Sequence, residues 1–411
     1  MSFFSFLFSN ARWLVGGFLL TLFSAFGQTY FISLSAGNIR AEYDLSHGQF
    51  GLIYMAATLA SALSLTWVGR LVDRFSPFHV TLIIIPLLAA GSVAMAFSHH
   101  IVTLVGVIYI LRLFGQGMMT QNAMTATARW FAANRGRAIS LVALGQNTGE
   151  ATFPLLFVLV AGAIGWRMSW VAGACLLIVV ALPAIAALYR RERVPQASDP
   201  EPKAAAARDW TRGEVLRDPA FWLMLVGVMA PPFIGTTIFF HQIYLVELRG
   251  WSLDDFAASF ALMSGMTIVF ALICGSLVDR LSAVRLLPSF LLPLAGACIV
   301  LAISPATWAP FIFMGLLGIS YGFSSTLFGA LWPEVYGTAH LGSIRSLTVA
   351  AMVFSTAMGP GLTGALIDMQ VSYPAQVFAM GLYCIMASVV LFFVSLRLAA
   401  RNAATEGQAL Q

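Results

Sequence analysis

Twelve apolar runs follow one another along this chain, with short polar turns between them. A helix needs about 20 apolar residues to cross the hydrocarbon core of a bilayer. Backbone groups cannot stay unpaired in lipid, so each run is predicted to be a helix. The runs cover residues 11–36, 48–69, 78–98, 101–127, 138–162, 167–189, 219–245, 254–278, 285–304, 307–331, 342–366 and 373–396. The sequence therefore predicts an all-α membrane protein with twelve transmembrane helices.

The balance of apolar and charged residues supports the same class. The chain is 59% hydrophobic and 9% charged, whereas a soluble domain has about 25% charged residues. The lipid bilayer is therefore the expected surrounding medium. The net charge of +5 does not indicate nucleic acid, because the basic residues are scattered between apolar runs and form no patch.

The basic residues predict the orientation. With the N-terminus placed in the cytoplasm, the inner loops hold 18 of the 22 Lys and Arg residues, and the outer loops hold Arg40, Arg167 and Arg249. Cytoplasmic loops of membrane proteins carry an excess of Lys and Arg. We therefore expect a multi-pass protein of the plasma (inner) membrane with both termini in the cytoplasm.

One long polar stretch divides the runs six and six. Residues 190–218 are rich in charge, Pro and Ala, which is typical of a linker. The predicted domains are an N-terminal six-helix half at 1–189, a cytoplasmic linker at 190–218, and a C-terminal six-helix half at 219–411 with a short cytoplasmic tail.

The two halves share a repeated charged turn. "GRLVDRFS" begins at Gly69 and "GSLVDRLS" begins at Gly275, 206 positions later. Other identities at the same offset pair Ser46 with Ser252, Phe50 with Phe256, Gly136 with Gly342, Ser140 with Ser346, Leu141 with Leu347 and Pro154 with Pro360. A duplicated six-helix unit explains them. Parallel repeats of this kind are a transporter architecture, with the substrate site between the halves near the midplane.

The repeated turn resembles a motif of the major facilitator superfamily. The Gly-x-Leu-x-Asp-Arg pattern of that family is matched by Gly69, Leu71, Asp73 and Arg74, and its second copy by Gly275, Leu277, Asp279 and Arg280. The resemblance implies a gating role for Asp73, Arg74, Asp279 and Arg280, with Asp73 and helix 11 closing the inner side. It also implies a central cavity lined by helices 1, 4, 7 and 10.

A second stretch is similar to one branch of that superfamily. "WFAANRGRAISLVALGQNTG", from Trp130 to Gly149, resembles the helix 4–5 signature of the monocarboxylate and oxalate/formate transporters. The acidic-Gly-aromatic feature of helix 1 in that branch is replaced here by "FSAFGQTYF". The resemblance implies a small monocarboxylate-like substrate.

Two enzyme-like patterns have a simpler interpretation. "GISYG" (Gly318–Gly322) and "GPGLTG" (Gly359–Gly364) fit hydrolase and dinucleotide motifs, but both lie inside apolar runs with no preceding strand. Small residues there favour close helix packing. A P-loop is excluded because the single lysine, Lys203, follows no such glycine pattern. We expect no ATP binding, no cofactor, no metal site and no enzyme activity.

Two charges lie deep inside predicted spans. Counted at about 1.5 Å per residue, Arg112 in helix 4 and Glu150 in helix 5 both fall near the middle of the membrane. Charged residues at that depth mark functional sites. Two interpretations stay open: a permanent Arg112–Glu150 ion pair that joins the helices, or a site where Arg112 binds an anion and Glu150, its partner in the empty state, takes up a proton.

Polar neighbours favour the second interpretation. The candidate substrate-binding residues are Arg112, Gln28, Tyr30, Tyr54, Gln116, Gln146, Asn147 and Tyr321. His241, near the outer end of helix 7, is a second proton-coupling candidate beside Glu150, because histidine titrates near physiological pH. The repeat position of Arg112 is Gly318, so the positive charge belongs to the first half alone.

The sequence favours a secondary active transporter that moves a small organic anion by alternating access, with proton coupling as an option. Its expected partners are a small-molecule substrate and the bilayer, and it is expected to act as a monomer. One alternative is a proton-driven exporter of drugs or metabolites. Another is a membrane receptor or an intramembrane enzyme.

Overall fold

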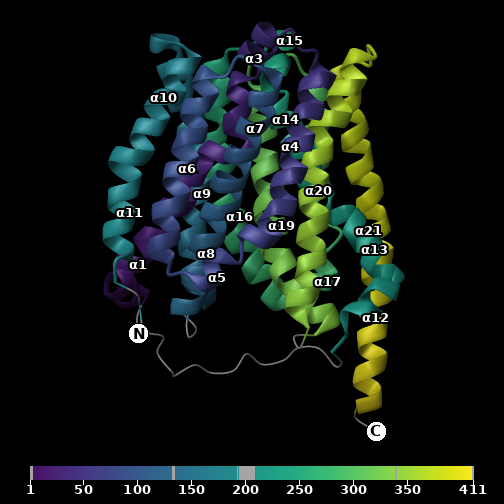
Figure 1. Ribbon diagram of the computed structural model, residues 1–411. Coiled ribbons are helices and arrows are strands. Elements are labelled where there is room, and N and C mark those ends of the chain that lie inside the picture. The colour runs from purple at the N-terminus through teal and green to yellow at the C-terminus, as the bar shows by residue number, and fades with distance from the viewer. Residues whose placement is uncertain (1–2, 132–134, 192, 194–208, 338–339, 410–411) are drawn as a thin grey trace. The chain divides into compact units, whose positions relative to one another are not determined.

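The computed structural model describes residues 3–131, 135–191, 193, 209–337 and 340–409. At residues 3–5, 73, 135, 136, 279, 342, 343 and 402–409 it describes the backbone alone. Every regular element in these ranges is a helix, and none is a strand (Figure 1). The predicted all-α class is therefore confirmed for the described chain.

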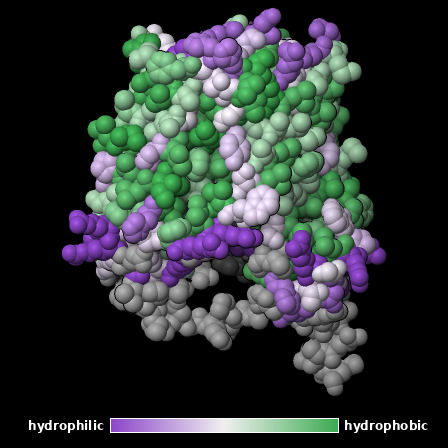
Figure 2. All heavy atoms as spheres, in the orientation of Figure 1, coloured by the Kyte–Doolittle hydropathy of each residue, from purple (hydrophilic) through white to green (hydrophobic). Residues whose placement is uncertain are grey.

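Most of the predicted spans are long apolar helices. In the described ranges, eleven helical stretches are long and apolar enough to cross a membrane: Phe6–Gly27, His47–Val68, Pro77–Phe97, Ile101–Trp130, Arg137–Ile164, Trp166–Tyr189, Pro219–Phe240, Leu253–Val278, Ala309–Tyr336, Ile344–Asp368 and Tyr373–Arg401. Figure 2 shows apolar side chains over the sides of the helices and hydrophilic ones near their ends. Such apolar sides fit a lipid environment.

The ninth predicted span is shorter than expected. The run 285–304 contains α18 (Leu292–Ile303), preceded by turns and by the short helix α17 (Ala283–Leu286). Pro288 lies in the turn and Pro293 in the first turn of α18. Proline lacks a backbone N–H and is tolerated best at a helix start, which is the position that Pro293 occupies.

The chain forms two compact units. Unit 1 contains the described residues of 1–201 with Phe239–Leu248 and Pro360–Ala365. Its elements are α1 (Phe3–Phe23), η1 (Ser24–Gly27), α2 (Thr29–Ile32), η2 (Ser33–Ser35), α3 (Ala36–Tyr43), α4 (His47–Val68), α5 (Leu71–Arg74), α6 (Pro77–Phe97), α7 (Ile101–Ile110), η3 (Leu111–Met119), α8 (Thr120–Trp130), α9 (Arg135–Ile164), α10 (Trp166–Leu176), η4 (Leu177–Ala181), α11 (Leu182–Tyr189) and most of α15 (Gln242–Arg249).

Unit 2 contains the remaining residues. Its elements are α12 (Arg212–Arg217), α13 (Pro219–Val228), most of α14 (Ala230–Phe240), α16 (Leu253–Leu281), α17, α18, α19 (Ala309–Tyr336), most of α20 (Leu341–Asp368) and α21 (Tyr373–Ala409). Gly318 and Gly322 of α19 pack against the backbone of α16, where an added Cβ atom would collide with Met263 and Thr267. The "GISYG" segment is thus a close helix contact, as predicted.

The sequence repeat has a structural counterpart at two helix starts. Ser46 caps α4, because its hydroxyl accepts a hydrogen bond from the Gln49 amide at 3.1 Å. Ser252, 206 residues later, caps α16 by accepting from the Asp255 amide at 3.4 Å. A serine N-cap contributes about 1 kcal/mol. The repeated serines therefore begin the second long helix of each predicted half.

The first predicted span is not one continuous helix. The run 11–36 contains α1, η1, α2 and η2, and Gln28 between η1 and α2 has an extended backbone with φ −82° and ψ 151°. The fourth span, Ile101–Trp130, is unbroken but contains the π-helical segment η3 at its centre. π-Helical segments are rare and frequently occur at functional sites. Both irregular segments lie within unit 1.

Candidate functional site

The break in the first span and the π-helical segment η3 pack directly on each other. An added Cβ atom on Gly27 would lie 2.6 Å from the Cα atom of Gly115 and 2.6 Å from the backbone nitrogen of Gln116. Only glycines allow two backbones to approach this closely. Irregular backbone at membrane depth is tolerated where it is buried in protein or lines a water-filled cavity. This contact places the break in the first span beside η3, which carries Arg112.

Arg112 is held against that break. Its side chain is buried, with 3% of its surface exposed. The Nη1 atom donates hydrogen bonds to the Gly27 carbonyl oxygen at 3.2 Å and to the Thr29 hydroxyl at 3.1 Å. The Tyr54 hydroxyl also donates to Thr29, at 2.7 Å, and the Arg112 guanidinium lies 5.5 Å from the centre of the Tyr54 ring. One hydroxyl and one broken-helix carbonyl therefore position the guanidinium.

The guanidinium keeps one edge unused. Within the described chain, the Nε atom of Arg112 is buried and has no hydrogen-bond partner. A buried donor without an acceptor is unfavourable by about 1–3 kcal/mol. A carboxylate can accept two parallel hydrogen bonds from one edge of a guanidinium. The arrangement is therefore suited to an anionic ligand that completes the bonding of Arg112.

The predicted ion pair between Arg112 and Glu150 is not formed. Among the ion pairs of the described residues, none joins these two side chains. Arg112 is bound by the first span, whereas a Glu150 carboxylate oxygen accepts a hydrogen bond from Gln146 at 3.1 Å. Glu150 is half-buried. Equal depth was the basis of the predicted pair, but depth does not determine which way a side chain points around its helix.

The other predicted substrate-binding residues are distributed over both units. Gln28 is buried beside the helix break, and Gln116 and Asn147 are half-buried on η3 and α9. Tyr321 belongs to unit 2, where its hydroxyl donates to the Pro231 carbonyl at 3.5 Å. That carbonyl lies at the start of α14, next to the interruption between α13 and α14. Each unit thus has a polar side chain at an interrupted helix.

The predicted gating residues lie at helix ends. Arg74 ends α5 and Arg280 lies in the last turn of α16, and both are exposed. The side chains of Asp73 and Asp279 lie outside the part of the chain that the structure describes. The gating assignments therefore stay predictions.

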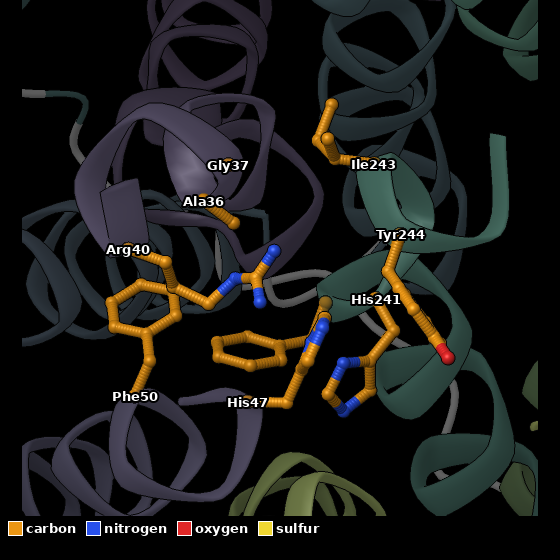
Figure 3. A pocket seen from close by; sticks show the side chains of 9 residues that line it. Ala36, Gly37, Arg40, His47, Phe50, His241, Ile243 and Tyr244 are labelled. Carbon is orange, nitrogen blue, oxygen red and sulfur yellow. The ribbon is translucent and has the colours of Figure 1, made fainter. Parts of the chain in front are cut away.

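His241 belongs to a small pocket of unit 1. The pocket lies at the end of the unit opposite the start of α1, and Figure 3 shows the side chains around it. Its lining residues are Ala36, Gly37, Arg40, His47, Phe50, Phe240, His241, Ile243 and Tyr244. The rings of His47 and His241 lie 6.0 Å apart, and the His47 ring lies 4.2 Å from the Tyr244 ring.

Several residues of these two sites are absent from the predicted set. They are Gly27, Thr29, Gly115, Arg40, His47 and Tyr244. The stretch "GQTYFISLSAGN" contains a signal for the first two, because Gly, Gln, Ser and Thr interrupt the apolar run. No local pattern links His47 to His241, which are far apart in the chain. Among the described residues, no group of three or more His, Cys, Asp or Glu side chains could hold a metal ion.

Long apolar helices and a buried arginine at a broken helix define a multi-pass membrane protein with a polar site inside a helical unit. Residues 17–352 match the sequence profile of the Major Facilitator Superfamily. The chain therefore belongs to this family. Because the family and its structural neighbours are transporters and not enzymes, the predicted exclusion of enzyme activity is confirmed, and the expected family is confirmed with it.

Individual relatives are similar over most of the chain. A phosphoglycerate transporter protein of Salmonella typhimurium is 24% identical, over 85% of this chain and 82% of that protein. An oxalate:formate antiporter of Oxalobacter formigenes is 23% identical, over 83% and 81%. A bacterial homologue of the human lysosomal transporter Spinster, crystallised in an inward-facing, unoccupied conformation, has a TM-score of 0.68 at 18% identity, with 96% of each chain covered. That likeness shows the shared fold.

Proposed function

We propose that this protein is a secondary transporter that moves a small organic anion across the plasma (inner) membrane by alternating access. The observation that carries the proposal is the unused edge of Arg112, whose buried Nε atom has no partner within the described chain. A substrate carboxylate, phosphate or sulfonate would supply the missing acceptors. The relatives named for phosphoglycerate and for oxalate and formate support an anionic substrate.

The polar side chains around Arg112 give each residue a role in this proposal. Thr29 and Tyr54 orient the guanidinium, while Gln28, Tyr30, Gln116, Gln146 and Asn147 contact the remainder of the substrate. The substrate-binding role of Tyr321, in unit 2, stays a prediction. Glu150 takes up a proton when the substrate binds, since a neutral carboxyl is preferred in a poorly hydrated site. The positive-inside distribution supports cytoplasmic termini, and a single chain is sufficient for transport.

Uptake into proteoliposomes tests the proposal. Labelled oxalate, lactate and 3-phosphoglycerate are supplied with and without an imposed pH gradient. Arg112→Lys keeps the charge but loses the planar edge that holds an anion by two hydrogen bonds. We expect the KM for the transported anion to rise by about tenfold or more, which corresponds to at least ~1.4 kcal/mol, while the protein stays folded.

Two further outcomes decide the finer points. Thr29→Val removes one acceptor for Nη1 but leaves the Nε edge, so it is expected to raise KM less than Arg112→Lys does. Glu150→Gln is expected to keep anion exchange and lose acceleration by the pH gradient. An Arg112→Lys variant with unchanged KM for every transported anion contradicts the proposed anion site. Proton-driven extrusion of uncharged drugs, without transport of anions, would favour the exporter alternative.

A further inference from the structure

Segments from the second half of the sequence are built into unit 1. Phe239–Leu248 and Pro360–Ala365 belong to unit 1, whereas the rest of the helices from which they come, Arg249 at the end of α15 included, lies in unit 2. In an alternating-access transporter, segments of this kind are the ones that change partners between conformations. What holds them in unit 1 therefore determines how easily the transporter opens at that end.

Buried hydrogen bonds join the segment Phe239–Leu248 to the rest of unit 1. The Ser33 hydroxyl donates to the Phe239 carbonyl oxygen at 2.6 Å. The Gln242 amide nitrogen donates to the Tyr30 carbonyl oxygen and to the Ser33 hydroxyl, both at 2.8 Å. The Phe240 ring stacks on Phe50 with a centroid distance of 5.1 Å. None of these contacts involves a group that titrates near neutral pH.

The second segment packs backbone to backbone. An added Cβ atom on Gly51 would lie 3.1 Å from the Cα atom of Gly361, and one on Gly364 would lie 3.1 Å from the Cα atom of Gly48. The segment Pro360–Ala365 contributes no titratable side chain. It covers the first turns of α4, which begins at His47.

The pocket at the edge of this contact is different, because it gathers groups that can carry positive charge. Figure 3 shows the Arg40 guanidinium and the rings of His47 and His241 directed toward one another. His241 is 3% exposed. The other titratable side chains around the pocket are Tyr244 and Glu247 of α15, and Glu247 lies 3.8 Å from an added Cβ atom on Gly37.

Protonation of the histidines would therefore weaken the contact. A charged imidazole is unfavourable in a buried position and beside another cation, and here His47, His241 and Arg40 would all be positive. Glu42, on the same helix as Arg40, is bound to Arg167. In an open state the histidines would be hydrated, and water stabilises the charged imidazole. Acid therefore favours the state in which the histidines are released.

We propose that His47, His241 and Arg40 form an acid-sensitive latch, which holds Phe239–Leu248 and Pro360–Ala365 in unit 1 at neutral pH and releases them when the histidines take up protons from the outer solution. The inference rests on the proposed function, because the latch has a role only in a protein that alternates between two conformations. It adds a control of opening by external pH that does not require the Arg112 site.

Cysteine labelling tests the latch without any substrate. Ser33→Cys places a thiol beneath Phe239, where it is buried while the segment is in place. Cys175 is the exposed native cysteine and is replaced by Ser. Val102→Cys, at a residue that is 84% exposed at the same end of unit 1, corrects for the effect of pH on thiol reactivity. The labelling reagent is a membrane-impermeant maleimide, added from outside to sealed vesicles.

The expected result is a rise in the labelling of the Ser33→Cys variant, relative to that of the Val102→Cys variant, between pH 7.5 and pH 5.5. Each coupled proton can change the open fraction by at most about tenfold per pH unit. His47→Gln with His241→Gln is expected to abolish the rise, and each single variant to reduce it. His100→Gln, an exposed histidine outside the pocket, is the matched control and is expected to keep the rise.

Two results would overturn the latch. One is a labelling ratio that does not change with pH in the parent protein. The other is an unchanged pH response in both single histidine variants. This second result can be obtained even if the double variant fails to fold. Because labelling requires no substrate, failure of every anion to be transported would reject the proposed function and leave this test intact.

Discussion

Gly115 of η3 lies directly on the backbone of Gly27. An added Cβ atom on Gly115 would be 2.6 Å from the Gly27 Cα atom and 2.7 Å from its nitrogen. This contact brings the interrupted first span so close to η3 that Arg112 reaches the Gly27 carbonyl oxygen. The position of the buried charge thus depends on two residues without side chains.

Gly115→Ala is expected to impair folding and transport together. The new methyl group has no space, and overpacking of this kind destabilises by about 1–3 kcal/mol. Gly106→Ala is the matched control, because Gly106 lies in the same span and an added Cβ atom there has no neighbour within 4 Å. Thermal unfolding in detergent measures the difference in Tm. Equal Tm values for the two variants would contradict the close contact.

Arg112 and Glu150 are expected to behave as independent sites in a double-mutant cycle. Arg112→Gln, Glu150→Gln and the double variant are compared by the free energy of unfolding. Because the two side chains have different partners, their effects should add within about 0.5 kcal/mol. A permanent ion pair would instead give a double variant that is more stable than the more affected single variant. That rescue would restore the ion-pair interpretation.

The fold could be predicted from the sequence because apolar length alone requires helices in a membrane. The break in the first span and the π-helical segment η3 could not be predicted. Gly27 and Gly115 indicate these irregularities only once the structure shows that their backbones are in contact. The same holds for the partner of Arg112. The helical rise per residue predicts that Arg112 and Glu150 lie at similar depth in the membrane. The π-helical segment that contains Arg112 has i→i+5 hydrogen bonds, which change the direction in which a side chain points around the helix. His47 and His241 meet through tertiary packing, which no local pattern contains.

Each unit has an arginine that binds near the start of its first span and near the end of another helix. In unit 1, Arg193 donates to Asn10 at 3.0 Å and to the Trp130 carbonyl, and its guanidinium lies 4.3 Å from the centre of the Phe131 ring. In unit 2, Arg401 binds Asp218 at 3.1 Å and the Val335 carbonyl oxygen at 3.3 Å. Trp130 and Tyr336, at the repeat offset, end α8 and α19.

Arg401→Gln is expected to lower the stability of unit 2. The change removes the cation from Asp218, which is largely buried and also accepts a hydrogen bond from the Tyr336 hydroxyl at 3.0 Å. Loss of a hydrogen bond to a charged group destabilises by about 1–3 kcal/mol. Arg397→Gln, at an exposed position one turn earlier, is the control and should change stability by less than about 0.5 kcal/mol. Denaturant titration followed by circular dichroism compares them, and equal midpoints would count against the interaction.

Acid is expected to weaken the end of unit 1 where Glu42 binds Arg167. The hydrogen bond from Arg167 lowers the pKa of Glu42 below its usual value of 4.5, with His99 adding a smaller effect and burial opposing both. A lowered pKa in the folded state means that Glu42 contributes stability above pH 4.5, and that this contribution is lost as the pH falls through the lowered value. Arg167 also donates to the Ser98 carbonyl oxygen at 2.9 Å, so that α3, through Glu42 and Arg167, is connected to the loop after α6.

Wild-type and Glu42→Gln proteins are compared by Tm from pH 7 down to about pH 3. The wild type should have the higher Tm at neutral pH, and the difference should disappear at the acidic end. His99→Gln separates the contribution of the histidine. A Tm difference that is the same at every pH would show that Glu42 does not act through its charge.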